Sequence, residues 1–256
     1  MIPGAREKEL LEAANLFLNA RRTHTPIADL PAALAPTSLE EVVRIHGFMA
    51  EAFGEVGGWK IGAPSADATP FFAPMPRAWM AASEAHLVGP RFRYRGLEAE
   101  IAFQLGSDLP PRAQPYTREE VYAAVASCHP VIEELESALV DPAAVNKLTM
   151  FADMQSHGAL VYGLAYANWR TQDFTKETVA LIVNGVVTIE RTGSNTSGDL
   201  LRLLPYLANE GAAITGGLRA GQWITTGSWT GNTPAPPNST VEARFGHAGS
   251  AALRFA

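Results

Sequence analysis

The segment Leu97-Glu98-Ala99-Glu100-Ile101-Ala102-Phe103 begins with alternating apolar and polar residues, which predicts a β-strand. Successive side chains of a strand point to opposite faces, so Glu98 and Glu100 share one face. Their carboxylates lie about 7 Å apart along the strand and repel each other unless a positive charge lies between them. Hard divalent cations prefer such oxygen ligands. The pair is therefore a candidate part of a metal site, although a solvated strand face explains the same pattern.

A third carboxylate ends the run Pro130-Val131-Ile132-Glu133. The apolar residues before Glu133 indicate partial burial, where a lone charge is costly unless it is paired or bound to a metal. Glu134 and Glu136 follow closely, so the spacing alone leaves open which carboxylate points inward. A solvated turn or an acidic helix end is the alternative.

Lys60 lies in Gly57-Gly58-Trp59-Lys60-Ile61-Gly62. Glycines permit close approach of another backbone. Burial between Trp59 and Ile61 would lower the pKa of the lysine and suit acid–base work. A surface lysine in a short strand is the simpler alternative.

Two further polar segments are candidate linings of a site. Asp153, Ser156 and His157 lie between apolar runs, where they either line a site or cap a strand. Thr226 and Ser228 belong to a stretch of small hydrogen-bond donors that can hold a carboxylate or simply form a turn.

The rest of the chain predicts an α+β fold, with N-terminal helices followed by a mixed, largely antiparallel β roll. Residues 1–56 form the expected helical section and 57–256 the β domain. Ser38 and Glu41 form a capping-box pattern, and Thr117 with Glu120 forms another. We expect a long irregular connection over 63–90 and a helix within 199–213. The predicted strands include a hairpin at Asn184-Gly185 and the segments WITTGSW, STVEARF and SAALRF.

Composition narrows the class of protein. The 256 residues carry a formal net charge of −6, which gives no indication of a nucleic-acid or membrane-surface partner. A single cysteine, Cys128, cannot form an intramolecular disulfide, which favours a reducing, cytoplasmic location. No signal peptide or membrane span is expected. Dinucleotide-binding, Walker, nucleophile-elbow and HExxH signatures are absent from the sequence.

Taken in order, six segments resemble the fumarylacetoacetate hydrolase superfamily, in its 2-oxopent-4-enoate hydratase and 2-oxo-3-hexenedioate decarboxylase branch. The segments are WKIGAPS (59–65), LEAEIAFQLGSDLP (97–110), HPVIEELES (129–137), FADMQSHGALVYG (151–163), VNGVV (183–187) and LRAGQWITTGSWTG (218–231).

The resemblance implies a Mg²⁺ or Mn²⁺ site formed by Glu98, Glu100 and Glu133. It also implies catalytic roles for Lys60 and Asp153, and a small 2-oxo acid as substrate. Ser65, Ser156, Thr226 and Ser228 are the expected substrate contacts. The implied protein is a cytoplasmic homo-oligomer, or one subunit of a complex with a homologous hydratase or decarboxylase.

The favoured activity is that of a hydro-lyase, a metal-dependent hydratase of a 2-hydroxydienoate from aromatic catabolism. Three alternatives stay open: a 2-oxo acid decarboxylase, a C–C bond hydrolase and a non-catalytic partner subunit. The chain departs from the usual family residues at Glu136, Ala138, Met154 and Gln222. These departures suggest an altered surrounding of the metal site and activity on a related substrate.

Overall fold

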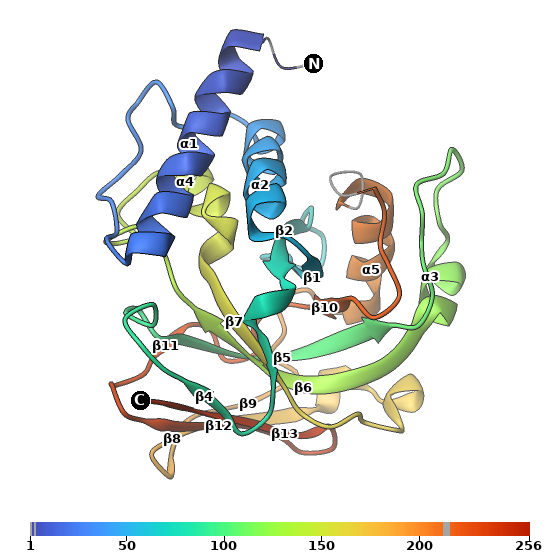
Figure 1. Cartoon of the computed structure of the whole chain (residues 1–256). Helices are drawn as coiled ribbons and strands as arrows, with labels where there is room; N and C mark the ends of the chain where they lie inside the picture. Colours follow the sequence, from blue (N-terminus) through green and yellow to red (C-terminus); the bar gives the residue numbers. More distant parts are fainter. Residues whose placement is uncertain (1, 3, 212–215) are drawn as a thin grey trace.

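The computed structural model describes residues 2, 4–211 and 216–256. Two long helices, α1 (Gly4–Thr23) and α2 (Leu39–Phe53), stand on one side of the sheets, and the N-terminus lies at the far end of α1 (Figure 1). α1 buries Leu10, Ala14 and Phe17 but leaves Leu11 exposed. The helices share a hydrophobic core with residues of the β section, including Ala73 and Met154. The helical section is therefore packed onto the β section rather than built around a separate core.

One of the two predicted capping boxes forms in full. Thr117 accepts from the backbone N–H of Glu120, and the Glu120 carboxylate accepts from the N–H of Thr117 at the start of α3 (Arg118–Ala124). Ser38 caps α2 by accepting from the N–H of Glu41. The Glu41 carboxylate accepts from Arg6 and from the N–H of Thr37. These contacts replace the hydrogen bond from the Ser38 N–H that would complete the second capping box.

The larger sheet carries the predicted Glu98–Glu100 strand at its centre. Its strand order is β2-β1-β10-β5-β6-β7-β3, with the short β11 pairing with β5. Most neighbours are antiparallel, while β1–β10 and β3–β7 are parallel. The strands are β1 (Val56–Gly62), β2 (Phe71–Pro76), β3 (Met80–Ala82), β5 (Gly96–Leu105), β6 (Val125–Leu135), β7 (His157–Tyr162), β10 (Trp223–Thr225) and β11 (Thr233–Pro234).

The smaller sheet has the order β4-β13-β12-β8-β9 and lies below the larger sheet in Figure 1. Asn184 and Gly185 adopt positive φ angles in the β8–β9 turn, as the hairpin prediction requires. The strands are β4 (Ala85–Leu87), β8 (Thr178–Val183), β9 (Val186–Thr192), β12 (Thr240–Phe245) and β13 (Gly249–Phe255). The mixed, largely antiparallel α+β architecture that the sequence predicted is confirmed.

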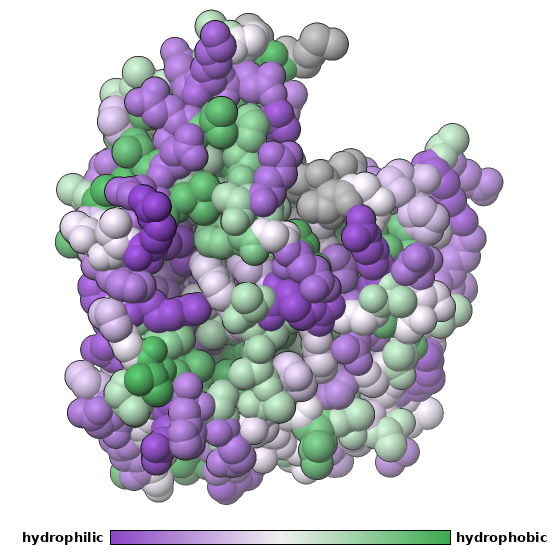
Figure 2. All heavy atoms as spheres, viewed as in Figure 1, coloured by the Kyte–Doolittle hydropathy of each residue, from purple (hydrophilic) through white to green (hydrophobic). Residues whose placement is uncertain are grey.

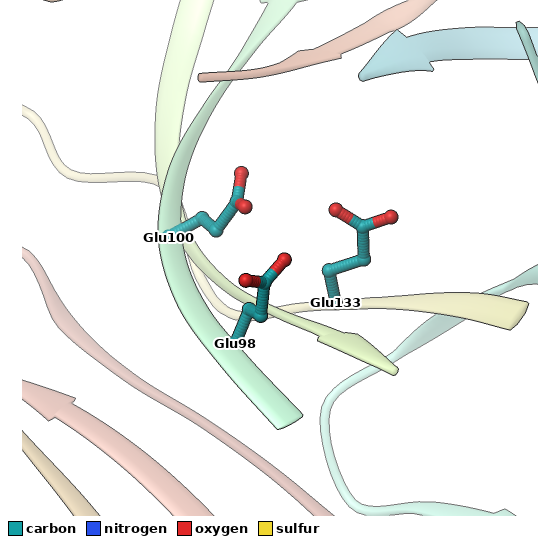
Figure 3. A group of neighbouring side chains, drawn as sticks. All are labelled: Glu98, Glu100 and Glu133. Atoms are coloured by element: carbon teal, nitrogen blue, oxygen red, sulfur yellow. The ribbon is translucent and has the colours of Figure 1, made fainter. Parts of the chain in front are cut away.

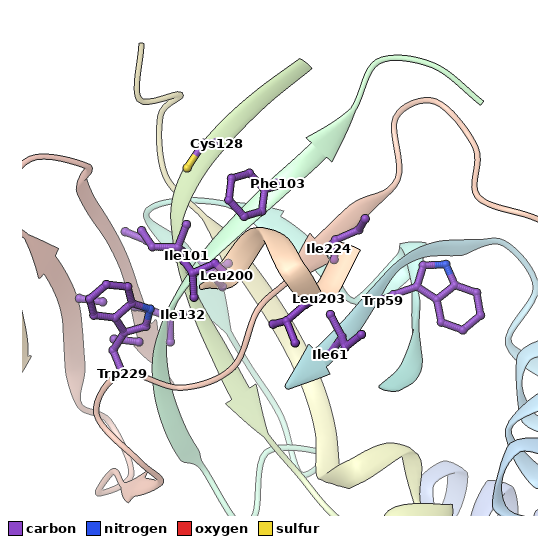
Figure 4. Packing of buried hydrophobic residues seen from close by; sticks show 14 of the residues in the cluster. Trp59, Ile61, Ile101, Phe103, Cys128, Ile132, Leu200, Leu203, Ile224 and Trp229 are labelled. Carbon is purple, nitrogen blue, oxygen red and sulfur yellow. The ribbon is translucent and has the colours of Figure 1, made fainter. Parts of the chain in front are cut away.

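A single large core joins the two sheets. Figure 4 shows Ile101, Phe103 and Ile132 from the central strands packed with Trp229, beside Trp59 and Ile224 from the neighbouring strands. These side chains are almost fully buried, and each such burial is worth about 1.5–3 kcal/mol. The core packs against one face of the central strands β5 and β6. Polar side chains of these strands, including the predicted metal-site glutamates, lie on the other face. The outer surface interleaves hydrophilic and hydrophobic residues over the face that Figure 2 shows.

Pro130 lies inside the central strand β6, where its carbonyl accepts from Gly163. Two expectations need correction. Residues 63–90 are not an irregular connection, because β2, β3 and β4 lie within them and pair with strands distant in sequence. The expected helix over 199–213 is broken into short turns around α5 (Leu203–Tyr206), and residues 212 and 213 lie outside the described part. α4 (Lys147–Ala152) is a helix that the sequence did not predict.

None of the helices in the described part is long and apolar enough to cross a bilayer.

Candidate metal and 2-oxo acid site

The pairing of β5 with β6 brings the three glutamates together. Glu98 lies opposite Glu133 in the antiparallel register, and Glu100 is two residues further along the same face of β5. Each glutamate offers an oxygen, and these oxygens all lie within 4.8 Å of one another. Figure 3 shows the three carboxylates converging on one space. Carboxylates held this close repel one another unless a cation or protons intervene.

Lys60 enters this group from β1. Its strand pairs with β10, which in turn pairs with β5, so the glycine-flanked segment lies two strands from the glutamates. The Lys60 Nζ lies 2.6 Å from Glu133 Oε1 and donates to the carbonyl of Gln155 at 3.0 Å. An ammonium has three N–H donors, so one remains for a ligand in the cavity.

Burial makes two of the carboxylates resist ionisation. Glu100 is 1% exposed, and its desolvation, reinforced by the charges of Glu133 and Glu98, raises its pKa well above 4.5. Thr225 and the N–H of Gly227 donate to its Oε2 and partly offset this effect. Desolvation likewise raises the pKa of Glu98 to about 7, with Lys60 opposing the shift. The group therefore holds less negative charge than three free carboxylates until a cation joins it.

Glu133 and Lys60 stabilise each other as ions. Burial opposes ionisation of both, but the attraction of Lys60 lowers the pKa of Glu133, and the carboxylates raise the pKa of Lys60 above 10.5. The expected lowering of the Lys60 pKa by burial is wrong, because the neighbouring carboxylates outweigh the desolvation. Lys60 is therefore a charged hydrogen-bond donor at neutral pH in the absence of a metal.

His157 is the second partner of Glu133. Its Nδ1 lies 2.9 Å from Glu133 Oε1, and both side chains are fully buried. Burial lowers the pKa of His157, which indicates a neutral ring whose N–H can face the carboxylate. The other oxygen, Glu133 Oε2, is buried without a hydrogen-bond partner among the described residues. This orphaned oxygen is a free ligand position.

A left-handed turn forms one wall of the site. Met154, Gln155 and Ser156 all have positive φ angles, between 49° and 59°. Such consecutive angles are costly for residues with side chains and are concentrated at functional sites. The turn directs the Gln155 carbonyl to Lys60, while Gln155 Nε2 is buried with no hydrogen-bond partner in the described part of the chain. No local sequence pattern indicates this role, because the turn depends on tertiary packing.

A cavity of about 330 Å³ opens onto the glutamates. Lys60, Glu98, Glu100, Ser156 and Ser228 line it, as the sequence predicted for site residues. Lining residues that the sequence analysis did not single out are Tyr94, Gln155 and Asn232, together with the apolar Leu135, Pro142, Ala143, Met150 and Phe151.

Four expected site residues lie outside this lining, and one of them is the fully buried Glu133. Asp153 is fully buried and binds Arg21, the Ser137 hydroxyl and the N–H of Ala138. Thr226 is also fully buried and donates to the carbonyl of Ile101. Ser65 is exposed, and its carbonyl accepts from Arg202. The contacts of Asp153 indicate that it holds the 137–138 backbone in place rather than touching the cavity.

The four departures from the family residues also lie away from the cavity lining. Met154 packs in the helical core, and Ala138 gives its N–H to Asp153. Gln222 donates to the carbonyl of Val56, and Glu136 accepts from the N–H of Tyr94. These residues support the chain around the site, so they do not by themselves alter the surface that a substrate would meet.

The comparisons with known proteins agree with this fold. No protein-family model matches the chain. The chain is 28% identical to 2-hydroxyhexa-2,4-dienoate hydratase of Comamonas testosteroni over 171 residues, which are 67% of this chain and 62% of the relative. The match therefore spans less than two thirds of that relative's length.

Solved structures match over nearly the whole chain. The 4-oxalocrotonate decarboxylase of Pseudomonas putida G7, complexed with magnesium and adipate, superposes with a TM-score of 0.83 at 21% identity, covering 97% of this chain and 98% of that one. Its complex with calcium and acetate gives 0.82 at 22% identity over the same shares of the two chains. A protein of Yersinia pestis CO92 assigned to the fumarylacetoacetate hydrolase family gives 0.59 at 15% identity, covering 77% and 91%.

The chain therefore has the fold of 4-oxalocrotonate decarboxylase, with the helical section before the β roll. Its sequence is similar to that of a hydratase from the branch to which its motifs pointed.

Proposed function

We propose that this protein is a divalent-metal-dependent hydratase of a 2-hydroxydienoate, or of its 2-oxo tautomer. The observation that carries the proposal is the convergence of Glu98, Glu100 and Glu133 beside the Lys60 ammonium, where Lys60, Glu98 and Glu100 line one cavity. The similarity to a hydratase, and to decarboxylase structures that contain magnesium or calcium, supports the same assignment.

The glutamates fit a divalent cation. They offer oxygen ligands alone, which suit Mg²⁺ or Mn²⁺, and Glu133 keeps one buried oxygen without a partner. The raised pKa values of Glu98 and Glu100 reflect a shortage of positive charge that a cation would relieve. A bound cation would supply Lewis acidity to the oxygens of the 2-oxo acid head.

The chain's own polar groups would orient the substrate. Lys60 has one N–H left for a developing enolate oxygen, and its positive charge stabilises such an oxygen. Gln155 Nε2 has no hydrogen-bond partner among the residues that the structure describes, and it would donate to the substrate carboxylate. Ser228 and Asn232 line the same cavity and add further donors.

Hydration of the dienoate requires two proton transfers and one water. The enol proton leaves the 2-hydroxyl and a proton arrives at C5, which gives an unsaturated ketone. Water then adds its hydroxyl to C4 and a proton reaches C3. In this scheme the Lys60 ammonium holds the proton nearest the 2-oxygen and stabilises the enolate form of each step.

The cavity favours a substrate with an uncharged tail. Apart from Lys60, no cation of the described residues lines it, while Leu135, Met150 and Phe151 do. The cations that are close in sequence to the lining residues make other contacts. Arg93 donates to the carbonyl of Leu139, and Arg95 donates to the carbonyls of Phe92 and Ala235. Lys147 lies over the Phe151 ring. A second carboxylate placed among apolar groups without a cation is unfavourable. This observation favours a monocarboxylate.

The second candidate is a 2-oxo acid decarboxylase, which the fold match to 4-oxalocrotonate decarboxylase favours. The hydratase and decarboxylase activities are distinguished by incubating the purified chain with Mg²⁺ and either 2-hydroxyhexa-2,4-dienoate or 2-oxo-3-hexenedioate. We expect loss of dienoate absorbance and a 4-hydroxy-2-oxo acid by NMR from the first substrate. Release of CO₂ from the second without hydration of the first would establish the decarboxylase instead.

A further inference from the structure

A second cavity, of about 720 Å³, lies outside the catalytic cavity and has about twice its volume. It is enclosed by the last turn of α1, the end of α2, the turn at residues 77–79 and the segment 90–93. The ring of Trp79 lines it and stacks on His157, whose other neighbour is Glu133. The two cavities are separate spaces, because their linings have no residue in common.

Its lining is strongly basic. Arg21, Arg22, Arg91 and Arg93 line the cavity, while Glu136 is the single acid among the described lining residues. Glu136 lies 3.6 Å from Arg93 and also accepts from two backbone N–H groups. Arg21 is paired with the buried Asp153. Two of the four cations are therefore balanced by carboxylates.

The other two cations have no acid in ion-pair distance within the described residues. Arg22 donates to the side chain of Asn19, and Arg91 donates to the carbonyl of Gly158. Both acceptors are neutral, so these guanidinium groups keep their charge and several N–H donors.

Glu134 is fully buried beneath Gly158, and neither of its oxygens has a hydrogen-bond partner among the described residues. Glu134 is not one of the residues that line the cavity. The described lining therefore carries four guanidinium groups against one carboxylate.

Flat apolar surfaces complete the cavity. The Arg91 guanidinium lies 4.8 Å from the centre of the Trp79 ring, and Phe53 packs edge-on against the same ring at 4.7 Å. A guanidinium held on an aromatic ring presents its N–H groups in a fixed plane, which suits a carboxylate. Arg22 and Arg91 reach the cavity from two separate elements, so they can bind two negative groups of one ligand.

We propose that this cavity binds a small organic dianion, with two carboxylates held by Arg22 and Arg91 and an apolar middle against Trp79. The site is distinct from the metal site, and its ligand need not be the substrate.

The test is calorimetric titration of the full-length chain with phthalate, in the presence of a chelator so that the glutamates hold no cation. We expect saturable binding of one phthalate per chain, weakening as salt rises because the contacts are ionic. Benzoate, which has one carboxylate, should bind at least tenfold more weakly. Absence of saturable phthalate binding would overturn the proposal, and equal or tighter binding of inorganic phosphate would overturn the assignment to an organic anion.

Variants locate the site. Arg91→Gln should weaken phthalate binding at least tenfold, and Arg22→Ala should weaken it severalfold. Arg191→Ala removes the same charge from the exposed strand β9 and should bind as the wild type does. If Arg91→Gln does not fold, the affinity of Arg22→Ala for phthalate tests the site. Arg22 is exposed, and among the described residues its side chain donates only to Asn19, so its removal should leave the fold intact. Unchanged affinity in a folded Arg91→Gln chain, or in Arg22→Ala, would place the anion elsewhere and overturn the assignment.

Discussion

The Lys60 Nζ and the Glu133 Oε1 lie 2.6 Å apart, inside a group of three carboxylates that comes from two neighbouring strands. The lysine stabilises the ionised form of Glu133, while Glu98 and Glu100 resist ionisation. The proposed site therefore contains a permanent cation of its own beside the place where a metal would bind.

Lys60→Met should lower kcat by about 100-fold or more, because it removes the donor next to the 2-oxygen of the substrate. The measurement is the rate of dienoate hydration at saturating Mg²⁺. Lys176→Met, at a lysine whose side chain is 81% exposed, is the matched control and should keep the wild-type rate. A Lys60→Met enzyme with a wild-type kcat would remove Lys60 from the mechanism.

Gly58→Ala should destabilise the fold by roughly 1–3 kcal/mol and displace Lys60. A Cβ at this position would lie 2.3 Å from the carbonyl oxygen of Trp223 on β10, and backbone cannot move aside as a flexible side chain can. Urea unfolding measures the effect. Gly4→Ala, where a Cβ meets nothing within 4 Å, is the control. Equal stability of both variants would show that β1 and β10 are not held this closely.

His46 should make the protein less stable in acid. It is fully buried in α2, and its Nε2 donates to the carbonyl of Phe151. Burial lowers its pKa from 6.5 to about 4. Between these pH values the unfolded chain binds a proton that the folded chain excludes, so stability falls as pH drops from 6.5 to 4. The loss at pH 4.5 is on the order of 2–3 kcal/mol relative to pH 7.

The His46 effect is isolated by comparison with His46→Gln, which keeps a donor but does not titrate. Urea unfolding at pH 7 and pH 4.5 should show a smaller loss of stability in the variant than in the wild type. Identical losses in the two proteins would mean that His46 does not contribute to the acid sensitivity.

Ala143→Arg should extend the substrate range towards dicarboxylates. Ala143 is exposed and lines the catalytic cavity, so an arginine there supplies the missing cation for a charged tail. We expect 2-oxoadipate to bind about tenfold tighter in the variant, which corresponds to about 1.4 kcal/mol, with 2-oxohexanoate little changed. Competition with dienoate turnover measures both affinities.

Ala144→Arg adds the same charge one residue away, outside the cavity lining, and serves as the control. Wild-type protein that binds 2-oxoadipate as tightly as 2-oxohexanoate would contradict the uncharged-tail assignment while leaving metal-dependent binding of 2-oxo acids intact. Failure to bind either acid would contradict the proposed function itself.

Local sequence patterns predicted the parts of this protein in which local and tertiary preferences agree. The alternation around Glu98 and Glu100 predicted a strand with both carboxylates on one face, and Asn184-Gly185 predicted a hairpin. The burial of Lys60 was also expected, but the direction of its pKa shift was not. That direction depends on Glu133, which is 73 residues away in sequence and is brought near by strand pairing.

Other features required the tertiary structure. A proline disfavours a central strand, yet Pro130 lies in β6, which pairs with β5 on one side and β7 on the other. The left-handed turn at Gln155 has no glycine to mark it, so no turn pattern pointed to its buried amide. Asp153 stood out as a polar residue between apolar runs, but its oxygens are taken by Arg21 and Ser137, and Arg21 is 132 residues away.

The central claim is that Glu98, Glu100 and Glu133 hold one divalent cation that a 2-oxo acid head then joins. The direct measurement is titration of chelator-treated protein with Mg²⁺ and Mn²⁺, with and without oxalate, in wild type, Glu98→Gln and Glu100→Gln. We expect one saturable site for the metal ion. Its affinity for the ion should rise when oxalate is present and fall at least tenfold in each variant. Wild-type protein without saturable binding, or variants that bind as tightly as the wild type, would contradict the central claim.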